Sequence, residues 1–195
     1  MIIGWIRHGK TDWNALGKIQ GQTDIPLNEE GIRQASALAE RLAEQSGNWE
    51  AVVSSDLKRA RLTAHIIASR LAIPLLQADS RLRERHFGEV EGTTEPERIA
   101  RWGEAWRTTY EGKESDNSLR ERGMDFINDW VSAESYNRLL VVTHGSFLVQ
   151  MLHTLCEDLD DSYIQNMSLS IVERKEGGWH SVLHNCTAHL NNLTK

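Results

Sequence analysis

The chain has 195 residues, of which 39% are hydrophobic and 26% charged, the composition of an ordinary globular protein. Its formal net charge of −6 argues against a general nucleic-acid binder, because such proteins need a broad basic face to displace counterions. A chain of this length can bury one sizeable core, and no linker or repeat interrupts it. We therefore predict a single domain over residues 1–195.

The cysteines and the hydropathy of the chain indicate its location in the cell. The two cysteines form no CxxC motif and no disulfide framework, which is typical of a reducing environment. No apolar run approaches the length of a membrane span, and no signal peptide is visible. These features predict a cytoplasmic protein with no membrane partner.

The first half of the chain alternates strand and helix patterns. Ile2–Arg7 is a short apolar run typical of a buried strand. Asn28 is a predicted N-cap for a helix reaching to about residue 45, since apolar residues follow it at helical spacing. A second strand is expected over Ala51–Ser54, a helix over Lys58–Leu71, and a third, short strand over residues 73–76.

The second half continues the alternation. A helix is predicted over residues 118–130, followed by the strongest strand signal of the chain at residues 138–145 and an apolar helix over 146–155. Two further strands, 168–174 and 179–185, flank a Glu-Gly-Gly turn and predict a hairpin.

This order of elements predicts the fold class. Alternating β and α elements indicate an α/β fold, with three α/β/α layers built on a mostly parallel sheet. The closing hairpin adds an antiparallel edge. Residues 91–117 lack a strand pattern and are predicted to form a small helical insertion over the active site. Trp102 and Trp106 would share one helical face there, either fixing the insertion to the domain or lining a lid.

Unusual polar residues follow the predicted strands. Arg7 and His8 end the first strand, His144 ends the strongest one, and Arg59 opens the helix after the second. Ligands of open α/β sheets bind beyond the carboxyl ends of the strands, where free N–H groups of helix N-termini also favour anions. Guanidinium forks bind phosphate oxygens bidentately. The pattern therefore predicts a phosphoryl site.

Five motifs in register carry a family resemblance. RHGKTDWN resembles the RHG signature of the histidine phosphatase superfamily, which also contains the cofactor-dependent phosphoglycerate mutases. The resemblance continues along nearly the whole chain, apart from the insertion, in IQGQTDIPLNEEG, SSDLKRARLTA, RLRERHFGEVEG and VVTHGS.

The resemblance implies a role for each catalytic candidate. His8 would attack phosphorus as a neutral imidazole, which requires its other ring nitrogen to donate a proton, typically to a backbone carbonyl. Arg7, Arg59 and His144 would hold the non-bridging oxygens in the transition state. Glu84 would protonate the leaving oxygen and then deprotonate the attacking water.

The resemblance also implies a set of substrate-binding residues and a reaction without a metal or cofactor. The substrate-binding set consists of Asn14, Gln20, Gly21 and Gly145. His180 and His184 are four residues apart on a predicted strand, about 13 Å, which is too far to share one zinc ion. No metal site is expected.

Three functions are compatible with these residues. The first is a phosphatase acting on a small phosphorylated metabolite, and it fits the modest length of the insertion. The second is a phosphoglycerate mutase with the same chemistry. The third is a catalytically silent phospholigand-binding module, which would be expected to lack one of the catalytic groups.

The oligomeric state is open, because a free strand edge is compatible with a monomer or a homodimer.

Overall fold

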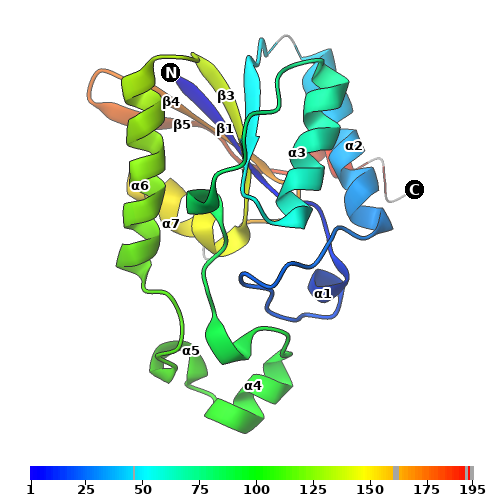
Figure 1. Cartoon of the computed structure of the whole chain (residues 1–195), viewed down its shortest axis with the longest axis vertical. Helices are drawn as coiled ribbons and strands as arrows, with labels where there is room; N and C mark the ends of the chain where they lie inside the picture. Colours follow the sequence, from blue (N-terminus) through cyan, green and yellow to red (C-terminus); the bar gives the residue numbers. More distant parts are fainter. Residues whose placement is uncertain (46, 160–162, 192, 194–195) are drawn as a thin grey trace.

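A computed structural model describes residues 1–45, 47–159, 163–191 and 193 of the chain (Figure 1). Helices lie on both sides of a central sheet. The molecule extends at one end into a small helical segment. None of the helices in these ranges is both long and apolar enough to cross a membrane.

The sheet has five strands in the order β2-β3-β1-β4-β5. The strands β1 (Ile2–Arg7), β3 (Arg138–Thr143) and β2 (Ala51–Ser54) pair in parallel. Antiparallel pairing then joins β4 (Leu169–Lys175) to β1 and β5 (Gly178–Cys186) to β4. The predicted parallel sheet with an antiparallel edge, and its closing hairpin, are confirmed.

Alternate side chains of the central strands enter two separate cores, which is why these strands are apolar throughout. Trp5 and Val141 pack under α6 (Asp116–Ala133) and α7 (Gly145–Leu155). The residues between them on the same strands point to the opposite face.

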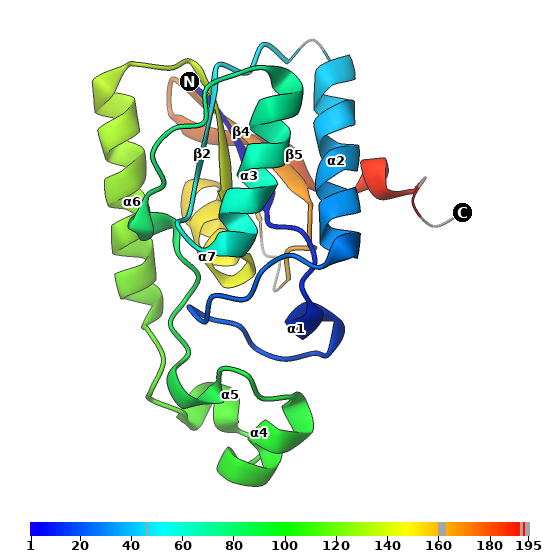
Figure 2. The same cartoon turned by 45° about the vertical axis from the view of Figure 1, so that its right-hand side comes forward.

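The second core contains Ile6 and Val142. It lies under α2 (Glu29–Glu44) and α3 (Lys58–Leu71), which cover the other face of the sheet (Figure 2). A strand buried on both faces gains apolar burial from every residue. The three-layer α/β/α arrangement is therefore confirmed.

Local sequence signals explain where these helices begin. Asn28 accepts a hydrogen bond from the Gly31 N–H at 2.9 Å and caps α2, as predicted. Short elements complete the chain: α1 (Asp12–Ala15), η1 (Ser80–Leu82), η2 (Gly88–Val90), α4 (Glu95–Trp102), α5 (Trp106–Thr109) and η3 (Ala188–Leu190).

The strand predicted over residues 73–76 is wrong. Only Leu75 forms a bridge there, to Val52 of β2. Pro74 lacks an N–H group, so it cannot donate to a ladder, and this segment contributes just two backbone hydrogen bonds to Val52.

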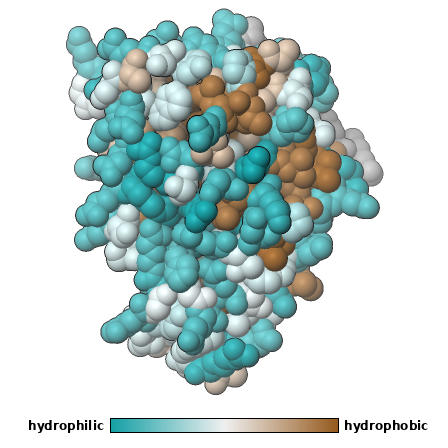
Figure 3. Space-filling model, in the orientation of Figure 1, coloured by the Kyte–Doolittle hydropathy of each residue, from teal (hydrophilic) through white to brown (hydrophobic). Residues whose placement is uncertain are grey.

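The segment 91–117 contains α4 and α5 and lies at the carboxyl ends of the parallel strands, at the same end as α1 (Figure 1). Gly103, at φ 80°, separates the two helices, so Trp102 and Trp106 do not share one helical face. Trp102 contacts Tyr110, with ring centroids 5.6 Å apart, whereas Trp106 is buried beside Arg98. On the face in view this end of the molecule is mainly hydrophilic (Figure 3).

Close packing of α6 on α7 gives a first prediction. A Cβ atom added to Gly123 would lie 2.2 Å from Sδ of Met151. We expect Gly123→Ala to lower the free energy of unfolding by about 1–3 kcal/mol, although alanine favours helix by about 1 kcal/mol. Urea denaturation measures this change.

A second substitution tests whether the cost comes from this contact. Shortening Met151 to alanine removes the clashing atom, so Gly123→Ala should cost less in that background. Stabilisation by Gly123→Ala alone would show that the two helices do not approach this closely.

Candidate active site

A pocket of about 260 Å³ opens at the carboxyl ends of β1 and β3. Of the residues predicted to form the site, those that line it are Arg7, His8, Asn14, Gln20, Gly21, Arg59 and Glu84. His144 and Gly145 lie directly behind it, with the His144 ring centroid 5.1 Å from that of His8. The predicted residues thus come together from four separate stretches of the sequence.

His8 follows β1 and is 2% exposed. Its Nδ1 lies 2.7 Å from the Gly9 carbonyl oxygen, and its Nε2 lies 3.2 Å from Nε of Arg59. A carbonyl only accepts and a guanidinium only donates, so the proton is on Nδ1 and the lone pair on Nε2. This is the tautomer that a nucleophilic Nε2 requires.

Arg59 is fully buried in the first turn of α3. Its terminal nitrogens donate to the carbonyl oxygens of Gly21 at 2.7 Å and Thr23 at 2.8 Å. Burial lowers the pKa of Arg59 to about 10, although the negative charge of Glu84 opposes this shift. The guanidinium therefore keeps its positive charge at neutral pH.

Arg7 approaches the pocket from the opposite side. Its Nη1 donates to the Ile164 carbonyl at 2.5 Å, and its guanidinium carbon lies 5.2 Å from the Tyr163 ring centroid. Its buried Nε has no partner among the described residues. A Cβ on Gly145 would lie 3.2 Å from this guanidinium carbon, so glycine makes room for the cation.

His144 is fully buried, and neither ring nitrogen has a partner in the described part of the chain. Burial above all, followed by the charge of Arg59, lowers the pKa of His144 well below its usual value. The same two causes, joined by the charge of Arg7, lower the pKa of His8. Both imidazoles are therefore neutral near pH 7.

Glu84 is 8% exposed and its carboxylate accepts three backbone N–H groups. These come from Arg85 at 2.9 Å and from Ser146 and Phe147 at 3.0 Å each. The neighbouring Arg81 and Arg83 form ion pairs with aspartates instead. Glu84 is thus a buried pocket carboxylate and not a surface ion-pair partner.

The expectation that free helix N-termini receive the anion needs correction. The first turn of α7 already donates Ser146 N–H and Phe147 N–H to Glu84. The first residue of α3, Lys58, donates its N–H to Asp24 at 2.7 Å. Carboxylates of the protein thus accept these three N–H groups at the two helix N-termini.

The loop after His8 is organised by Thr11. Its hydroxyl donates to Oε1 of Gln20 at 3.0 Å, and its backbone N–H donates to Oδ1 of Asn14 at 3.2 Å. Asn14 also completes the capping box of α1. With their oxygens held, the two amides retain N–H groups that can donate to a ligand in the pocket.

The sequence analysis missed several residues of this region. Phe87 and Tyr163 line the pocket, as does Lys18. Glu91 accepts hydrogen bonds from the N–H groups of Gln22, Thr23 and Phe87, and so joins the two loops on either side of the pocket. Glu91 lies inside the quoted RHFGEVEG motif, but nothing in that motif indicates its partners.

A metal site was not expected, and the described residues contain no group of three or more His, Cys, Asp or Glu that could hold an ion. The site combines a neutral imidazole, whose Nε2 lone pair faces the Arg59 guanidinium, with buried guanidinium groups and a carboxylate. These groups are suited to nucleophilic attack on an anionic phosphorus centre and to proton transfer at the leaving oxygen.

Comparison with known proteins agrees with this geometry. An "uncharacterized phosphatase PhoE" of Bacillus subtilis is 34% identical over 193 residues, covering 97% of each chain. A "metal-independent phosphoserine phosphatase" of Arabidopsis thaliana is 34% identical, covering 96% of this chain and 82% of the relative. A "probable phosphoglycerate mutase GpmB" of Serratia proteamaculans is 32% identical over 89% of this chain and 85% of the relative.

Solved structures give the same result. A mycobacterial glucosyl-3-phosphoglycerate phosphatase in complex with VO3 superposes with a TM-score of 0.84 at 28% identity, covering 95% of this chain and 99% of the other. YhfR of Bacillus stearothermophilus superposes with a TM-score of 0.85 at 27% identity, covering 97% and 99%. The family model of the histidine phosphatase superfamily (branch 1) matches residues 3–187, and the chain belongs to this superfamily.

Proposed function

We propose that this protein is a phosphatase that hydrolyses small phosphate monoesters through a phosphohistidine on His8, with Glu84 as general acid and base. The observation that carries the proposal is the pairing of the His8 Nε2 lone pair with a buried guanidinium, beside a carboxylate in one pocket. The proposed substrate is a small phosphorylated metabolite, and the free cysteines fit a cytoplasmic location.

In the first step, Nε2 of His8 attacks phosphorus in line with the ester oxygen. The N–P bond forms as the P–O ester bond breaks, and Glu84 gives its proton to the departing oxygen. Arg59 moves its Nε donor from the imidazole to a phosphoryl oxygen, while Arg7 and His144 offer further donors. Charge on the transferring group is then stabilised where it develops.

In the second step, Glu84 acts as a carboxylate. It takes a proton from a water molecule, whose oxygen attacks phosphorus as the N–P bond breaks. Inorganic phosphate leaves, His8 regains its neutral imidazole, and Glu84 holds the proton for the next leaving group. No step requires an oxidant, a metal or a second substrate.

The surroundings of the pocket favour hydrolysis over phosphoglycerate mutase chemistry. A mutase would use basic residues of the insertion to hold a second anionic group. Here Arg98 and Arg107 of the insertion both pair with Glu95, and no described residue of 91–117 lines the pocket. The complete set of reacting groups likewise favours an enzyme over a silent binding module.

The central test is hydrolysis of p-nitrophenyl phosphate from pH 5 to 8 with EDTA present. His8→Ala should lower turnover by at least about 10³-fold, because the variant lacks the attacking nitrogen. The exposed His65 provides a matched control, and His65→Ala should retain full activity.

Turnover retained by His8→Ala would contradict the proposal. Isolation of an acid-labile phosphoprotein from the unmodified chain would support it. The mutase alternative is tested with 3-phosphoglycerate and a bisphosphoglycerate primer, for which the proposal expects release of phosphate and no isomerisation.

Glu84→Gln separates the two halves of the reaction. The p-nitrophenolate leaving group needs little protonation, so the first turnover should stay fast. Hydrolysis of the phosphohistidine needs the base, and steady-state turnover should fall about 10²–10⁴-fold. Rapid-quench measurement should therefore show a burst of p-nitrophenol close to one equivalent. A loss of the burst together with turnover would argue against this role for Glu84.

The neutral state of His8 gives a prediction that does not depend on activity. Its pKa is lowered in the folded protein, while an unfolded histidine titrates near pH 6.5. Below about pH 6.5 the unfolded chain thus binds more protons, and stability falls as pH falls. Between pH 7 and 5 His8 should account for a loss of about 2 kcal/mol in the free energy of unfolding.

Urea denaturation at the two pH values measures this loss. His8→Asn should reduce the acid-induced loss by that amount, whereas His65→Asn should leave it unchanged. An identical pH dependence in His8→Asn and the unmodified protein would mean that His8 is not held neutral.

A further inference from the structure

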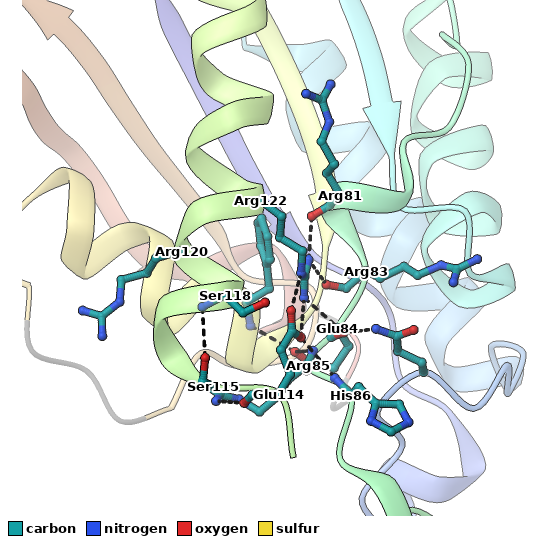
Figure 4. A network of polar contacts seen from close by, with 12 residues as sticks. Arg81, Arg83, Glu84, Arg85, His86, Glu114, Ser115, Ser118, Arg120 and Arg122 are labelled. Carbon is teal, nitrogen blue, oxygen red and sulfur yellow. Dashed lines mark hydrogen bonds and ion pairs between the residues drawn. The ribbon is translucent and has the colours of Figure 1, made fainter. Parts of the chain in front are cut away.

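The backbone that carries Glu84 has no regular secondary structure. Residues 83–87 connect η1 to η2 and form neither a helix nor a strand. A segment of this kind makes no ladder or helical hydrogen bonds, so contacts with other elements must fix its position. Figure 4 shows where these contacts come from.

One guanidinium supplies two of these contacts. Arg122, on α6, donates from Nη1 to the carbonyl oxygens of Arg81 at 2.5 Å and Arg83 at 2.7 Å. Its Nη2 donates to the Glu84 carbonyl at 3.3 Å. Two carbonyls of the segment, and that of Arg81 before it, are thus held by a planar, rigid fork (Figure 4).

The remaining donors of the fork bind Glu114. Nε of Arg122 contacts Oε1 of Glu114 at 2.8 Å, and Nη2 contacts Oε2 at 3.0 Å. A guanidinium has five N–H donors, and these contacts use all five. The Arg122 side chain is 18% exposed and that of Glu114 is 13% exposed, so the pair is shielded from water.

Glu114 also contacts the Glu84 segment directly. Its Oε2 accepts the His86 N–H at 3.3 Å, and its backbone carbonyl accepts Nη1 of Arg85 at 2.7 Å. Burial opposes the ionisation of Glu114, but the hydrogen bond and charge of Arg122, the His86 N–H and the charge of Arg85 together outweigh it and lower the pKa of the carboxyl. The end of the insertion is therefore joined to the two residues that follow Glu84.

Arg122 reaches the other partner of the carboxylate as well. Its guanidinium carbon lies 5.1 Å from the ring centroid of Phe147, whose N–H donates to Oε1 of Glu84. One side chain thus contacts the backbone of Glu84 and packs on a residue that holds its carboxylate.

We propose that Arg122, locked by Glu114, is a positioning residue that fixes Glu84 at the reacting phosphorus, and that it acts on the reaction only through Glu84. The inference rests on the proposed role of Glu84 as acid and base. A general base works only within about 2.6–3.2 Å of the proton, and a misplacement of about 1 Å can cost about 10²-fold. The pair supplies this placement to an otherwise irregular segment.

The test compares Arg122→Gln with Glu84→Gln by rapid-quench kinetics on p-nitrophenyl phosphate. Arg122→Gln should lower steady-state turnover about 10–100-fold while the p-nitrophenol burst keeps its rate, so KM should fall together with kcat and kcat/KM should change little. In the Glu84→Gln background, the same substitution should change turnover less than about twofold, because the group it positions is already absent.

Arg120→Gln is the matched control. Arg120 lies two positions earlier on α6, points away from the network and donates to the Asp116 carbonyl (Figure 4). Arg120→Gln removes the same charge from the same helix, and it should leave both the p-nitrophenol burst and the steady-state turnover unchanged.

Two further variants keep the test valid if Arg122→Gln does not fold. Arg122→Lys retains the positive charge but loses the planar guanidinium. Glu114→Gln retains Arg122 but removes the carboxylate that binds it. Both should show the same pattern of a preserved burst and slowed turnover, to a smaller extent. Thermal unfolding identifies any variant whose loss is simply unfolding.

Three results would overturn the inference: a burst slowed as much as turnover, an undiminished effect in the Glu84→Gln background, or full activity in folded Arg122→Gln. Full turnover in Glu84→Gln would instead overturn the acid–base role of Glu84, on which the inference rests.

Discussion

The contact on which the site depends is the hydrogen bond between the buried guanidinium of Arg59 and Nε2 of His8, at 3.2 Å. A cation taken out of water is costly unless its donors are satisfied. Arg59 satisfies its donors with the imidazole and with the carbonyls of Gly21 and Thr23. Without a ligand, the protein therefore holds a charged donor against the nucleophilic lone pair.

This constraint extends to the loops around the pocket. The carbonyls that hold Arg59 lie in the 20–23 loop, where Gly21 adopts φ +53°. A Cβ on Gly21 would lie 1.9 Å from Oε1 of Glu91, so only glycine lets that carboxylate bind the loop N–H groups. Glu91 also binds the N–H of Phe87, and thereby connects the Arg59 side of the pocket to the Glu84 side.

The sequence could predict the central strands and the residues at their ends, because burial on both faces leaves a continuous apolar run and parallel strands end at one edge. Arg7, His8 and His144 follow from that rule. Glu84 follows from the family resemblance alone, since an irregular segment has no periodicity to place it. Arg122 could not be found in this way, because its contact with the Arg83 carbonyl joins residues 39 positions apart.

The N-terminus of α7 has a part in the proposed reaction because it binds the acid–base residue Glu84. The first turn of α7 donates two N–H groups to Glu84, and a helix N-terminus stabilises an anion. These N–H groups bind the carboxylate form of Glu84, which activates water in the second step. The first step needs the protonated carboxyl. In the proposed cycle that proton is the one that Glu84 takes from water in the second step, so each hydrolysis prepares the acid for the next leaving group.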